Sequence, residues 1–387
     1  MYRMGIEELN AVGKVIETRA LFKINDLGQD VMHAEIELQE KLNVKHALLM
    51  TSGHAGLESA LVAMGIGPGD QVIVPAYTYI ATALAVVGAG AIPVIVDIND
   101  SLTLDPKAFE AAITPKTKAV IPVHIQGFPC QMDEICRIAK EHNILVLEDA
   151  CQADGGSFKG QRLATIGDCG AMSFNYFKII TAGEGGALFT NNKTYFERAL
   201  IYQDSAAVAF FGNQLEGFET DLFCGTEYRS NGISAAILRE QIKKLDDILL
   251  DLRSNKKYVM DALCGVCEFN PSNDIEGDCG TTIPFKFNTP EEAIAFKNYI
   301  GGTIPYETGK HVYTNWTPIM EKRGAFHPLM DPYKMEANKD IIPNYTKDMC
   351  QKSLDILCRV AYVGVSPDWT KAEMDEKIAE IKAALKA

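Results

Sequence analysis

Lys178 is the residue whose surroundings most clearly suggest chemistry. It follows an aromatic run within AMSFNYFKIITAGEGGALFT (171–190), and a Gly-Glu-Gly-Gly turn comes after it. Apolar runs typical of strands lie on both sides, so the amine is either paired, solvated or chemically used. A lysine that is desolvated or near other cations has a lowered pKa and becomes a competent nucleophile. The alternative is an ordinary surface lysine on a loop, and this stretch alone does not decide between the two.

The segment SGHAG (52–56), which contains Gly53, His54 and Ala55, has the properties of a phosphate-binding turn. It follows a predicted buried strand, HALLMT (46–51), and begins a helix. Small residues let a ligand approach the backbone, and a helix N-terminus offers free N–H groups and a positive dipole end. Many helices begin after Ser-Gly, so a simple N-cap is the commoner explanation of this segment alone.

Further candidate side chains follow two other predicted strands. Tyr79 comes after QVIVP (71–75) and offers a flat ring to an aromatic ligand, although core packing is the commoner role of such a residue. Glu148 and Asp149 stand at the end of ILVLE (144–148). A carboxylate at the mouth of an apolar strand is costly unless it has a partner, such as a protonated ring nitrogen. An N-cap for the next segment is an equal alternative.

Together these groups predict one ligand. Ser173 precedes Lys178 by five residues, so its hydroxyl can reach a phosphate while the lysine amine reaches the other end of the same molecule. A phosphate turn, an aromatic ring, an acid for a ring nitrogen and a lysine for a carbonyl describe a site for pyridoxal 5'-phosphate. The lysine would form a Schiff base with its aldehyde, and the acid would keep the pyridine nitrogen protonated so that the ring accepts electrons. Displaced by a substrate amine, the lysine would act as general acid and base.

The elements that must position these residues alternate along the first part of the chain. Predicted strands lie at 46–51, 71–75, 92–98, 118–123 and 144–148, and predicted helices at 6–18, 30–43, 78–91 and 131–142. The strands are continuously apolar, which is typical of a parallel sheet covered on both faces. Ligands of such sheets bind beyond the carboxyl ends of the strands, where the candidate residues stand.

A second, smaller domain is predicted after a long helical pattern at 233–263. The later part of the chain contains an apolar strand (281–287) and helical patterns at 291–300 and 371–387, which indicate an α+β domain. We predict that residues 1–240 hold the N-terminal segment and the large cofactor-binding domain. Residues 241–387 would then hold the linking helix and the small domain.

Composition and charge exclude several classes of protein. The formal net charge is −14 and no long Lys/Arg cluster occurs, which argues against nucleic acid as a partner. No apolar run reaches the roughly 18 residues of a transmembrane helix, and the N-terminus does not resemble a secretory signal. The cysteines lack a repeated framework, which is typical of reduced thiols in a cytoplasmic protein. The single C-x-x-C pair, Cys264 and Cys267, has no second pair at metal-binding spacing, so no metal site is predicted.

Several stretches resemble the DegT/StrS-type sugar aminotransferases, a family of fold type I pyridoxal-phosphate enzymes. They are TSGHAGLESAL, VPAYTYIAT, VLEDACQADGG, SFNYFKIITAGEGGALFTN and YRSNGISAAILREQIKKLDDI. The resemblance covers nearly the whole chain. It implies an α/β fold whose large domain has a mainly parallel seven-stranded sheet, followed by a smaller C-terminal α+β domain. LEDACQADGG and HVYTNWTPIMEKRGAFHP (311–328) are similar to two branches, the 8-amino-3,8-dideoxy-octulosonate and the scyllo-inosose aminotransferases.

The resemblance also implies roles for individual residues. Lys178 would be the Schiff-base lysine, Asp149 the partner of the pyridine nitrogen, Tyr79 the residue stacked on the ring, and Gln152 a neighbour of the 3-hydroxyl. The phosphate would be held by Gly53, His54, Ala55 and Ser173. Members of the family are homodimers whose active sites include residues of the neighbouring subunit.

Two departures from the family pattern stand out. The family commonly has Gly-Thr at the phosphate turn, where this chain has Gly53-His54. The family's Asn-Tyr-Arg is here Glu227-Tyr228-Arg229, and the asparagine usually reaches the neighbouring subunit's phosphate. A carboxylate there would repel the phosphate, so Glu227 either turns away toward Arg229, or is protonated, or the local register differs. The segment 204–224 also lacks the family's Asn-His-Gly run.

The sequence therefore predicts an aminotransferase that moves an amino group from glutamate or glutamine to a keto or aldehydo sugar. His311 is a candidate for the acceptor pocket, with a structural histidine as the commoner alternative. A pyridoxal-phosphate-dependent sugar dehydratase is the second possibility, although related dehydratases carry histidine where this chain has Lys178. The third is a non-catalytic protein that binds the cofactor as a sensor, which the unusual Glu227 suggests.

Overall fold

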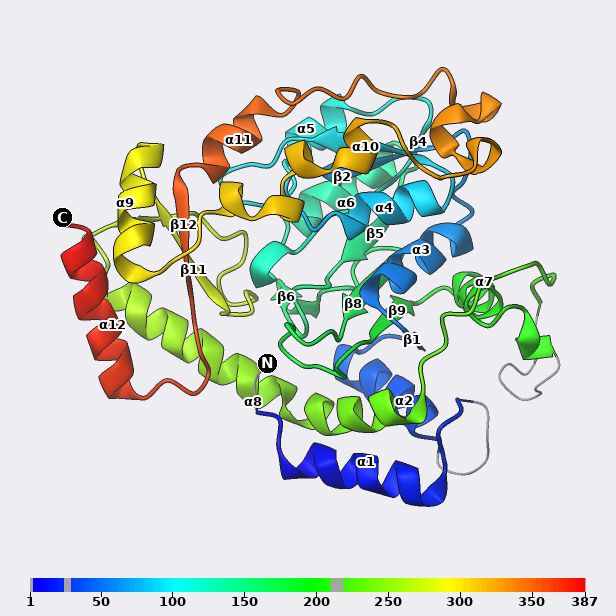
Figure 1. Ribbon diagram of the computed structural model, residues 1–387, viewed down its shortest axis with the longest axis horizontal. Helices are drawn as coiled ribbons and strands as arrows, with labels where there is room; N and C mark the ends of the chain where they lie inside the picture. Colours follow the sequence, from blue (N-terminus) through cyan, green and yellow to red (C-terminus); the bar gives the residue numbers. More distant parts are fainter. Residues whose placement is uncertain (1–2, 24–28, 210–216, 218, 387) are drawn as a thin grey trace.

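In the computed structural model, which describes residues 3–23, 29–209, 217 and 219–386, a seven-stranded sheet forms the centre of the molecule (Figure 1). Its order is β1 (His46–Met50), β9 (Gly186–Thr190), β8 (Cys169–Ser173), β5 (Leu145–Asp149), β4 (Thr117–Val120), β2 (Gln71–Pro75) and β3 (Ile92–Val96). Strand β9 is antiparallel to β1 and β8, and the remaining neighbours pair in parallel. The predicted α/β fold with a mainly parallel seven-stranded sheet is confirmed.

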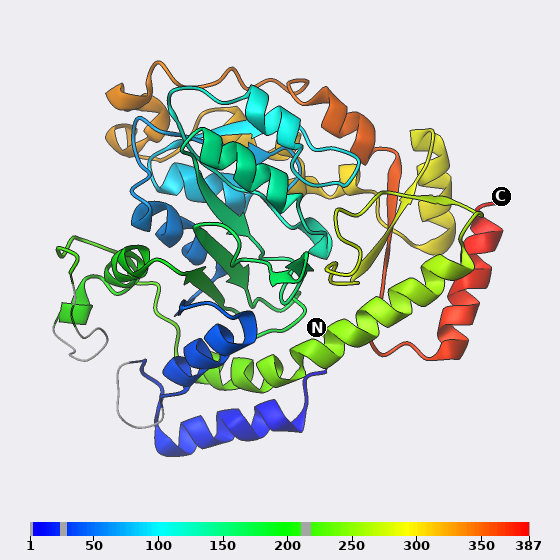
Figure 2. The same ribbon diagram turned by 180° about the vertical axis from the view of Figure 1, so that it is seen from behind.

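Helices cover both faces of this sheet, which explains its continuously apolar strands. Helices α3 (Gly53–Ala63), α4 (Ala81–Gly88) and α7 (Lys193–Gln203) share one hydrophobic core with the sheet, and α2 (Asp30–Leu42), α5 (Pro106–Ala111), α6 (Met132–Glu141) and α8 (Gly232–Ala262) share the other (Figures 1 and 2). Alternate residues of one strand belong to opposite cores: Leu48 faces α3, whereas Ala47 and Leu49 face α2. Each strand therefore has two buried faces.

Helix α4 begins later than the predicted helix at 78–91. The backbone N–H groups of Thr78 and Ile80 donate to the carbonyls of His311 and Lys310, at 3.0 Å each, so these residues pair with a distant segment instead of starting the helix. Tyr79 consequently stands before α4 and is 38% exposed. Its position in the loop after β2 leaves the ring free to face a ligand.

The long helix predicted at 233–263 is present as α8, and α1 (Ile6–Thr18) lies alongside it (Figure 1). At its far end α8 contacts a second sheet, formed by β10 (Glu268–Phe269), β11 (Thr282–Lys286) and β12 (Val360–Gly364). Helix α9 (Pro290–Ile300) contacts β12, and α12 (Lys371–Ala384) contacts α8 and α9. The predicted boundary between residues 240 and 241 falls inside α8, and the two-domain division stays a prediction.

Between α9 and β12 the chain returns to the large sheet. Tyr313 and Trp316 are buried in the core that contains α3 and α4, and the Tyr345 hydroxyl donates to the Pro93 carbonyl at 2.7 Å. This stretch includes α10 (Thr317–Met320) and α11 (Gln351–Leu357). Elsewhere, after β5, the chain forms a small hairpin of β6 (Ser157–Phe158) and β7 (Gln161–Arg162). None of the helices in the described ranges combines the length and apolar character needed to cross a bilayer.

Candidate active site

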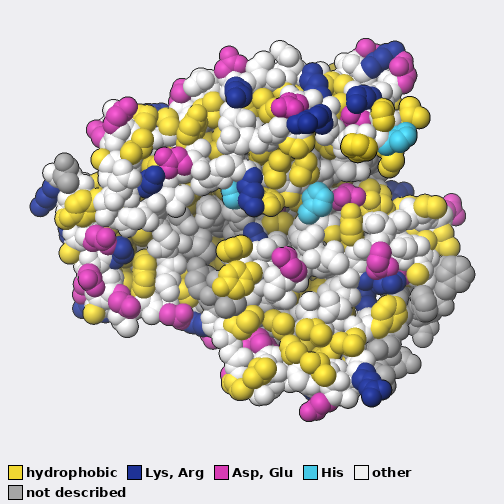
Figure 3. Space-filling model, in the orientation of Figure 1, with side chains coloured by type: hydrophobic (Ala, Val, Ile, Leu, Met, Phe, Trp, Pro, Cys, Tyr) yellow, Lys and Arg dark blue, Asp and Glu magenta, His cyan; other side chains and the backbone are white. Residues whose placement is uncertain are grey.

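A cavity of about 840 Å³ opens at the carboxyl ends of the strands, in the hollowed face of Figure 3, where lysine and histidine side chains gather. Most of the predicted site residues line it: Gly53, His54, Tyr79, Asp149, Gln152, Ser173, Lys178 and His311. Two predicted residues are not among its lining. Ala55 is buried in the core behind the phosphate turn, and Glu227 lies outside the cavity.

The turn between β1 and α3 is built for close approach to the sheet. The Ser52 hydroxyl caps α3 by accepting from the Ala55 N–H at 3.1 Å. A side chain at Gly53 would place its Cβ 2.6 Å from the Cys151 sulfur and 2.9 Å from the Ser173 Cβ, so only glycine fits. The helix N-terminus is thereby held against the ends of β5 and β8, with its first N–H groups at the cavity.

Asp149 presents a fixed carboxylate to the cavity. It is 5% exposed; Oδ2 accepts from the Thr82 hydroxyl at 2.7 Å, and Oδ1 accepts from the Cys151 N–H at 3.1 Å. The two donors fix the position of the carboxyl group. Thr82 comes from α4 and Asp149 from β5, so packing of this helix on the sheet sets the direction of the carboxylate.

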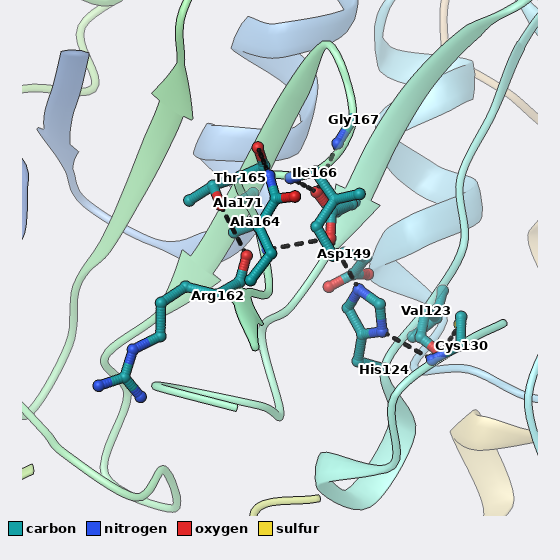
Figure 4. Close-up of polar contacts among 12 residues, drawn as sticks. Val123, His124, Cys130, Asp149, Arg162, Ala164, Thr165, Ile166, Gly167 and Ala171 are labelled. Atoms are coloured by element: carbon teal, nitrogen blue, oxygen red, sulfur yellow. Dashed lines mark hydrogen bonds and ion pairs between the residues drawn. The ribbon is translucent and has the colours of Figure 1, made fainter. Parts of the chain in front are cut away.

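Glu148, the other acid at the end of β5, is hydrogen-bonded inside the protein and does not line the cavity. Its carboxylate accepts from the N–H groups of Ala164, Ile166 and Gly167 at 2.6–3.0 Å. The His124 Nε2 lies 3.1 Å from it, while the Cys130 N–H donates to Nδ1 at 3.0 Å. The imidazole therefore carries its proton on Nε2 and donates it to Glu148. Figure 4 shows these groups gathered beside Asp149 at the end of β5. Of the two acids, Asp149, which the family resemblance implied as the acid of the site, is therefore the one that lines the cavity.

Lys178 stands in the turn after β8. Its backbone N–H donates to the Asn175 carbonyl at 3.0 Å, and the half-buried side chain lines the cavity. Within the described ranges no hydrogen bond or ion pair holds the amine, so it is free to meet a ligand. The Ser173 hydroxyl, at the end of β8, accepts a long hydrogen bond of 3.4 Å from the Asn175 N–H and keeps its own proton available.

The opposite part of the lining comes from the segment that returns after α9. The Tyr79 ring lies 5.5 Å from the His311 ring and 4.8 Å from the Lys310 ammonium. Gln152 connects the two sides: its Oε1 accepts from the Gln126 N–H at 3.0 Å, and its Nε2 lies 3.5 Å from the His311 Nε2. Burial, reinforced by the positive charges of Lys178 and Lys310, lowers the pKa of His311.

Glu227 turns toward its own chain. Its carboxylate lies 2.8 Å from the Arg229 guanidinium, which also pairs with the buried Asp204. The Glu227 side chain is 52% exposed. Of the three outcomes considered from the sequence, pairing with Arg229 is the one the structure has. Part of the 204–224 segment, residues 210–216 and 218, lies outside the described residues.

The lining fits pyridoxal phosphate. It combines an anion-binding helix N-terminus cradled by Gly53, a carboxylate held by two donors, an unpaired lysine and an exposed tyrosine ring. Sequence reasoning missed Thr82, Glu58, Gln126 and Lys310, which support or line this site. Thr82, Gln126 and Lys310 act through contacts with residues far away in the chain, which no local motif marks. Glu58, in contrast, pairs with His54 at the i,i+4 spacing of a helix and could have been found from the sequence.

Comparison with known proteins gives the same reading. Over 237 residues the chain is 41% identical to GDP-perosamine synthase of Caulobacter vibrioides, covering 61% of this chain and 62% of that protein. It is 36% identical to the L-glutamine:2-deoxy-scyllo-inosose aminotransferase of Streptomyces kanamyceticus, over 62% of this chain and 57% of that protein. The chain thus spans less than two thirds of the length of these relatives.

The fold also matches a solved aminotransferase from Psychrobacter cryohalolentis. The TM-score is 0.81 at 25% identity, over 99% of this chain and 97% of that one. A family model describes residues 4–294, which include every predicted site residue except His311. The chain belongs to the DegT/DnrJ/EryC1/StrS aminotransferase family.

Proposed function

We propose that this chain is a pyridoxal-phosphate-dependent aminotransferase that moves an amino group from glutamate or glutamine to a keto or aldehydo group of a sugar, sugar acid or cyclitol. The observation that carries the proposal is that Lys178, whose amine has no hydrogen-bond or ion-pair partner among the described residues, lines the same cavity as the fixed carboxylate of Asp149. An amine nucleophile and an acid for a ring nitrogen are the two groups that this chemistry requires of the protein.

Each residue has a defined task. When bound, pyridoxal phosphate supplies an aldehyde and an electron-accepting ring. Asp149, oriented by Thr82, holds the proton of the pyridine nitrogen. Lys178 would hold the aldehyde end of the cofactor through its amine. Once displaced by a substrate amine, it would take the proton from the substrate Cα as general base and deliver it to the cofactor as general acid. The free N–H groups at the start of α3 and the Ser173 hydroxyl hold the phosphate, and Tyr79 covers the ring.

The relatives support the substrate class. The names of the two proteins above refer to a nucleotide-linked amino sugar and to a keto cyclitol, and the second name also contains L-glutamine. A substrate with several hydroxyls suits the polar lining formed by Gln126, Gln152, Thr281, Thr282 and His311. Lys178 disfavours the dehydratase alternative, and the pairing of Glu227 with Arg229 removes the main motive for a non-catalytic sensor.

Borohydride reduction tests the assignment of Lys178. The purified protein is loaded with pyridoxal phosphate, reduced with borohydride and digested, and the peptide that carries the cofactor mass is sequenced. We expect the mass on Lys178. Labelling of another lysine, such as Lys310, with Lys178 unmodified would contradict the proposal.

A homodimer is also part of the proposal. Exposed hydrophobic side chains gather on α1, α2 and their flanking residues. They include Met4, Ile6, Leu9, Ile16, Leu21, Met32 and Ile36. Figure 3, in the orientation of Figure 1, shows hydrophobic side chains in the lower part of the molecule, where these two helices lie. Patches of this kind mark protein interfaces. Sedimentation should give a dimer that Leu9→Glu weakens, whereas a monomer at all concentrations would contradict it.

A further inference from the structure

The His54 ring lies between two hydrogen-bond acceptors. Its Nδ1 is 3.3 Å from the Ala81 carbonyl oxygen, and its Nε2 is 3.4 Å from a Glu58 carboxylate oxygen. Neither acceptor can donate, so only a ring with a proton on both nitrogens satisfies both contacts. The Glu58 carboxylate, against the opposing effect of burial, raises the pKa of His54, and Asp149 adds to the rise. The geometry therefore favours the imidazolium form.

Glu58 is held as the anion in this pair. It is 8% exposed and accepts from the Tyr202 hydroxyl at 2.7 Å and the Tyr228 hydroxyl at 3.3 Å. Burial alone would raise the pKa of Glu58, but the donors His54, Tyr202 and Tyr228 outweigh burial and lower it. Burial and Glu58 raise the pKa of Tyr228 to about 12, and raise that of Tyr202 as well. His54 is thus the group of this cluster that can change charge near neutral pH.

The pair stands at the phosphate turn. His54 is the second residue of α3, and Ser52 already occupies the Ala55 N–H and, through its carbonyl, the Gly56 N–H. The N–H groups of Gly53 and His54 donate to no group in the described part of the chain. They are thereby left for an anion, in the same cavity that the His54 side chain lines. Because its nitrogens are occupied by Glu58 and Ala81, the ring acts through its charge and not as a hydrogen-bond donor.

We propose that the His54 imidazolium, fixed by Glu58, is an electrostatic binding residue for the cofactor phosphate and makes cofactor affinity pH-dependent. The proposal rests on the proposed cofactor but not on amino transfer. A phosphate dianion favours the charged ring, so the contribution of His54 to affinity is largest between the second pKa of the phosphate, about 6, and the raised pKa of His54. It is lost as the pH rises through the pKa of His54. Above that pH, Glu58 keeps its charge and repels the phosphate.

The test measures noncovalent binding, with Lys178→Ala as the background so that no covalent bond forms. Dissociation constants are determined across the pH range for pyridoxal phosphate and for pyridoxal, which lacks the phosphate. We expect His54→Gln to weaken pyridoxal phosphate binding about tenfold between the pKa of the phosphate and that of His54, as expected for a charge at a partly buried helix terminus. Pyridoxal binding should change little. The difference between the His54→Gln and parent proteins should disappear at high pH.

Two matched variants sharpen the test. Glu58→Gln should move the pH transition down, toward the ordinary histidine value, because the carboxylate that stabilises the imidazolium is gone. His54→Thr, which offers a hydroxyl without charge, should abolish the transition. An unmoved transition in Glu58→Gln, or equal losses for pyridoxal and pyridoxal phosphate in His54→Gln, would overturn the proposal.

A measurement on the unmodified protein covers the case in which a variant folds poorly. The carbon-13 resonance of the His54 ring is followed against pH. It is identified by its loss in His54→Gln, or by ring labelling and selective broadening if that variant is unstable. It should titrate above the ordinary histidine value and move higher when inorganic phosphate is added. A transition at or below that value, or one that phosphate leaves unmoved, contradicts the proposal. A protein that passes this test but transfers no amine would refute only the proposed function.

Discussion

His54 and His311 line the same cavity, and their ring nitrogens meet opposite surroundings. His54 faces a carboxylate and a carbonyl, and Glu58 raises its pKa. His311 faces the Gln152 amide and the Thr308 carbonyl, and burial and two lysines lower its pKa. One side of the cavity therefore has a ring whose surroundings favour the protonated form, and the other a ring whose surroundings favour the neutral form, with one nitrogen donating and the other accepting. This difference suits a phosphate on the first side and the hydroxyls of a sugar-like substrate on the second.

The comparison extends to the residues around each histidine. On the side formed by the strand ends, Asp149 and the α3 turn are held by hydrogen bonds of 2.7–3.1 Å. On the side formed by the returning segment, Lys310 is exposed, and the side-chain contacts of His311, at 3.3–3.5 Å, are as long as those of His54. We infer that Asp149 and the α3 turn are fixed for a cofactor, whereas the side with the exposed Lys310 adapts to substrate. Changes on the first side should affect every substrate, and changes on the second should affect substrates selectively.

The largest effect is expected from Lys178→Ala. This change removes the amine that serves as both nucleophile and acid/base, so kcat should fall by more than roughly 10⁴-fold with every donor and acceptor. Steady-state rates and the visible spectrum of the bound cofactor measure the loss. Lys310→Ala, on the adaptable side, is the matched control and should retain turnover. Near-normal turnover of Lys178→Ala would contradict the assignment of Lys178 as the nucleophile and the general acid and base.

Asp149→Asn should come next. The amide keeps the size of the side chain but cannot stabilise a protonated ring nitrogen, so kcat should fall by about 10²- to 10³-fold for both half-reactions. Single-turnover rates with donor and with acceptor separate the two halves. A loss confined to one half-reaction would contradict the assignment of Asp149 to the cofactor.

His311→Gln tests the second side. Loss of a neutral imidazole that contacts substrate should raise substrate KM by about tenfold and leave the cofactor dissociation constant unchanged. Because its pKa is lowered, wild-type His311 remains neutral above the ordinary histidine value and acquires charge only at lower pH. KM of the wild-type protein should therefore change on the acid side of the pH profile. This change should be absent in His311→Gln. Weakened cofactor binding in this variant would argue that the two sides are not separate.

Thr82→Val should have the smallest effect. It removes one hydrogen bond to Asp149, worth about 1 kcal/mol, while nearly preserving the volume of the side chain. We expect kcat to fall by severalfold with KM unchanged, and a denaturant titration should show a loss of stability of similar size. A larger loss than that of Asp149→Asn would mean that Thr82 has a role beyond orienting the carboxylate.

Much of this arrangement could be predicted from the sequence. The strands, the long helix α8 and the gathering of Lys178, Asp149 and Tyr79 at one edge follow from apolar periodicity and from the rule that parallel strands end together. The family resemblance implied Asp149 as the acid of the site, and the structure adds the physical reason: three N–H groups of the loop at 164–167 bind Glu148.

The partners from distant parts of the chain could not be predicted. Thr82 meets Asp149 across 67 residues of sequence, and Gln152 meets His311 across 159. The sequence predicts a helix from residue 78, whereas α4 begins at residue 81, because the carbonyls of residues 310 and 311 accept from the N–H groups of residues 80 and 78. No local sequence pattern indicates this pairing. Glu227 likewise paired with Arg229 in a way that the sequence left as one of three possibilities.

The most direct test of the central claim is the first half-reaction alone. The purified protein is loaded with pyridoxal phosphate and mixed with glutamate or with glutamine, without an acceptor. The cofactor is then recovered and identified by mass. We predict conversion to pyridoxamine phosphate with at least one donor, accompanied by an equal amount of the matching 2-oxo acid, and no conversion in Lys178→Ala. A cofactor that stays in the aldehyde form with both donors would contradict the account.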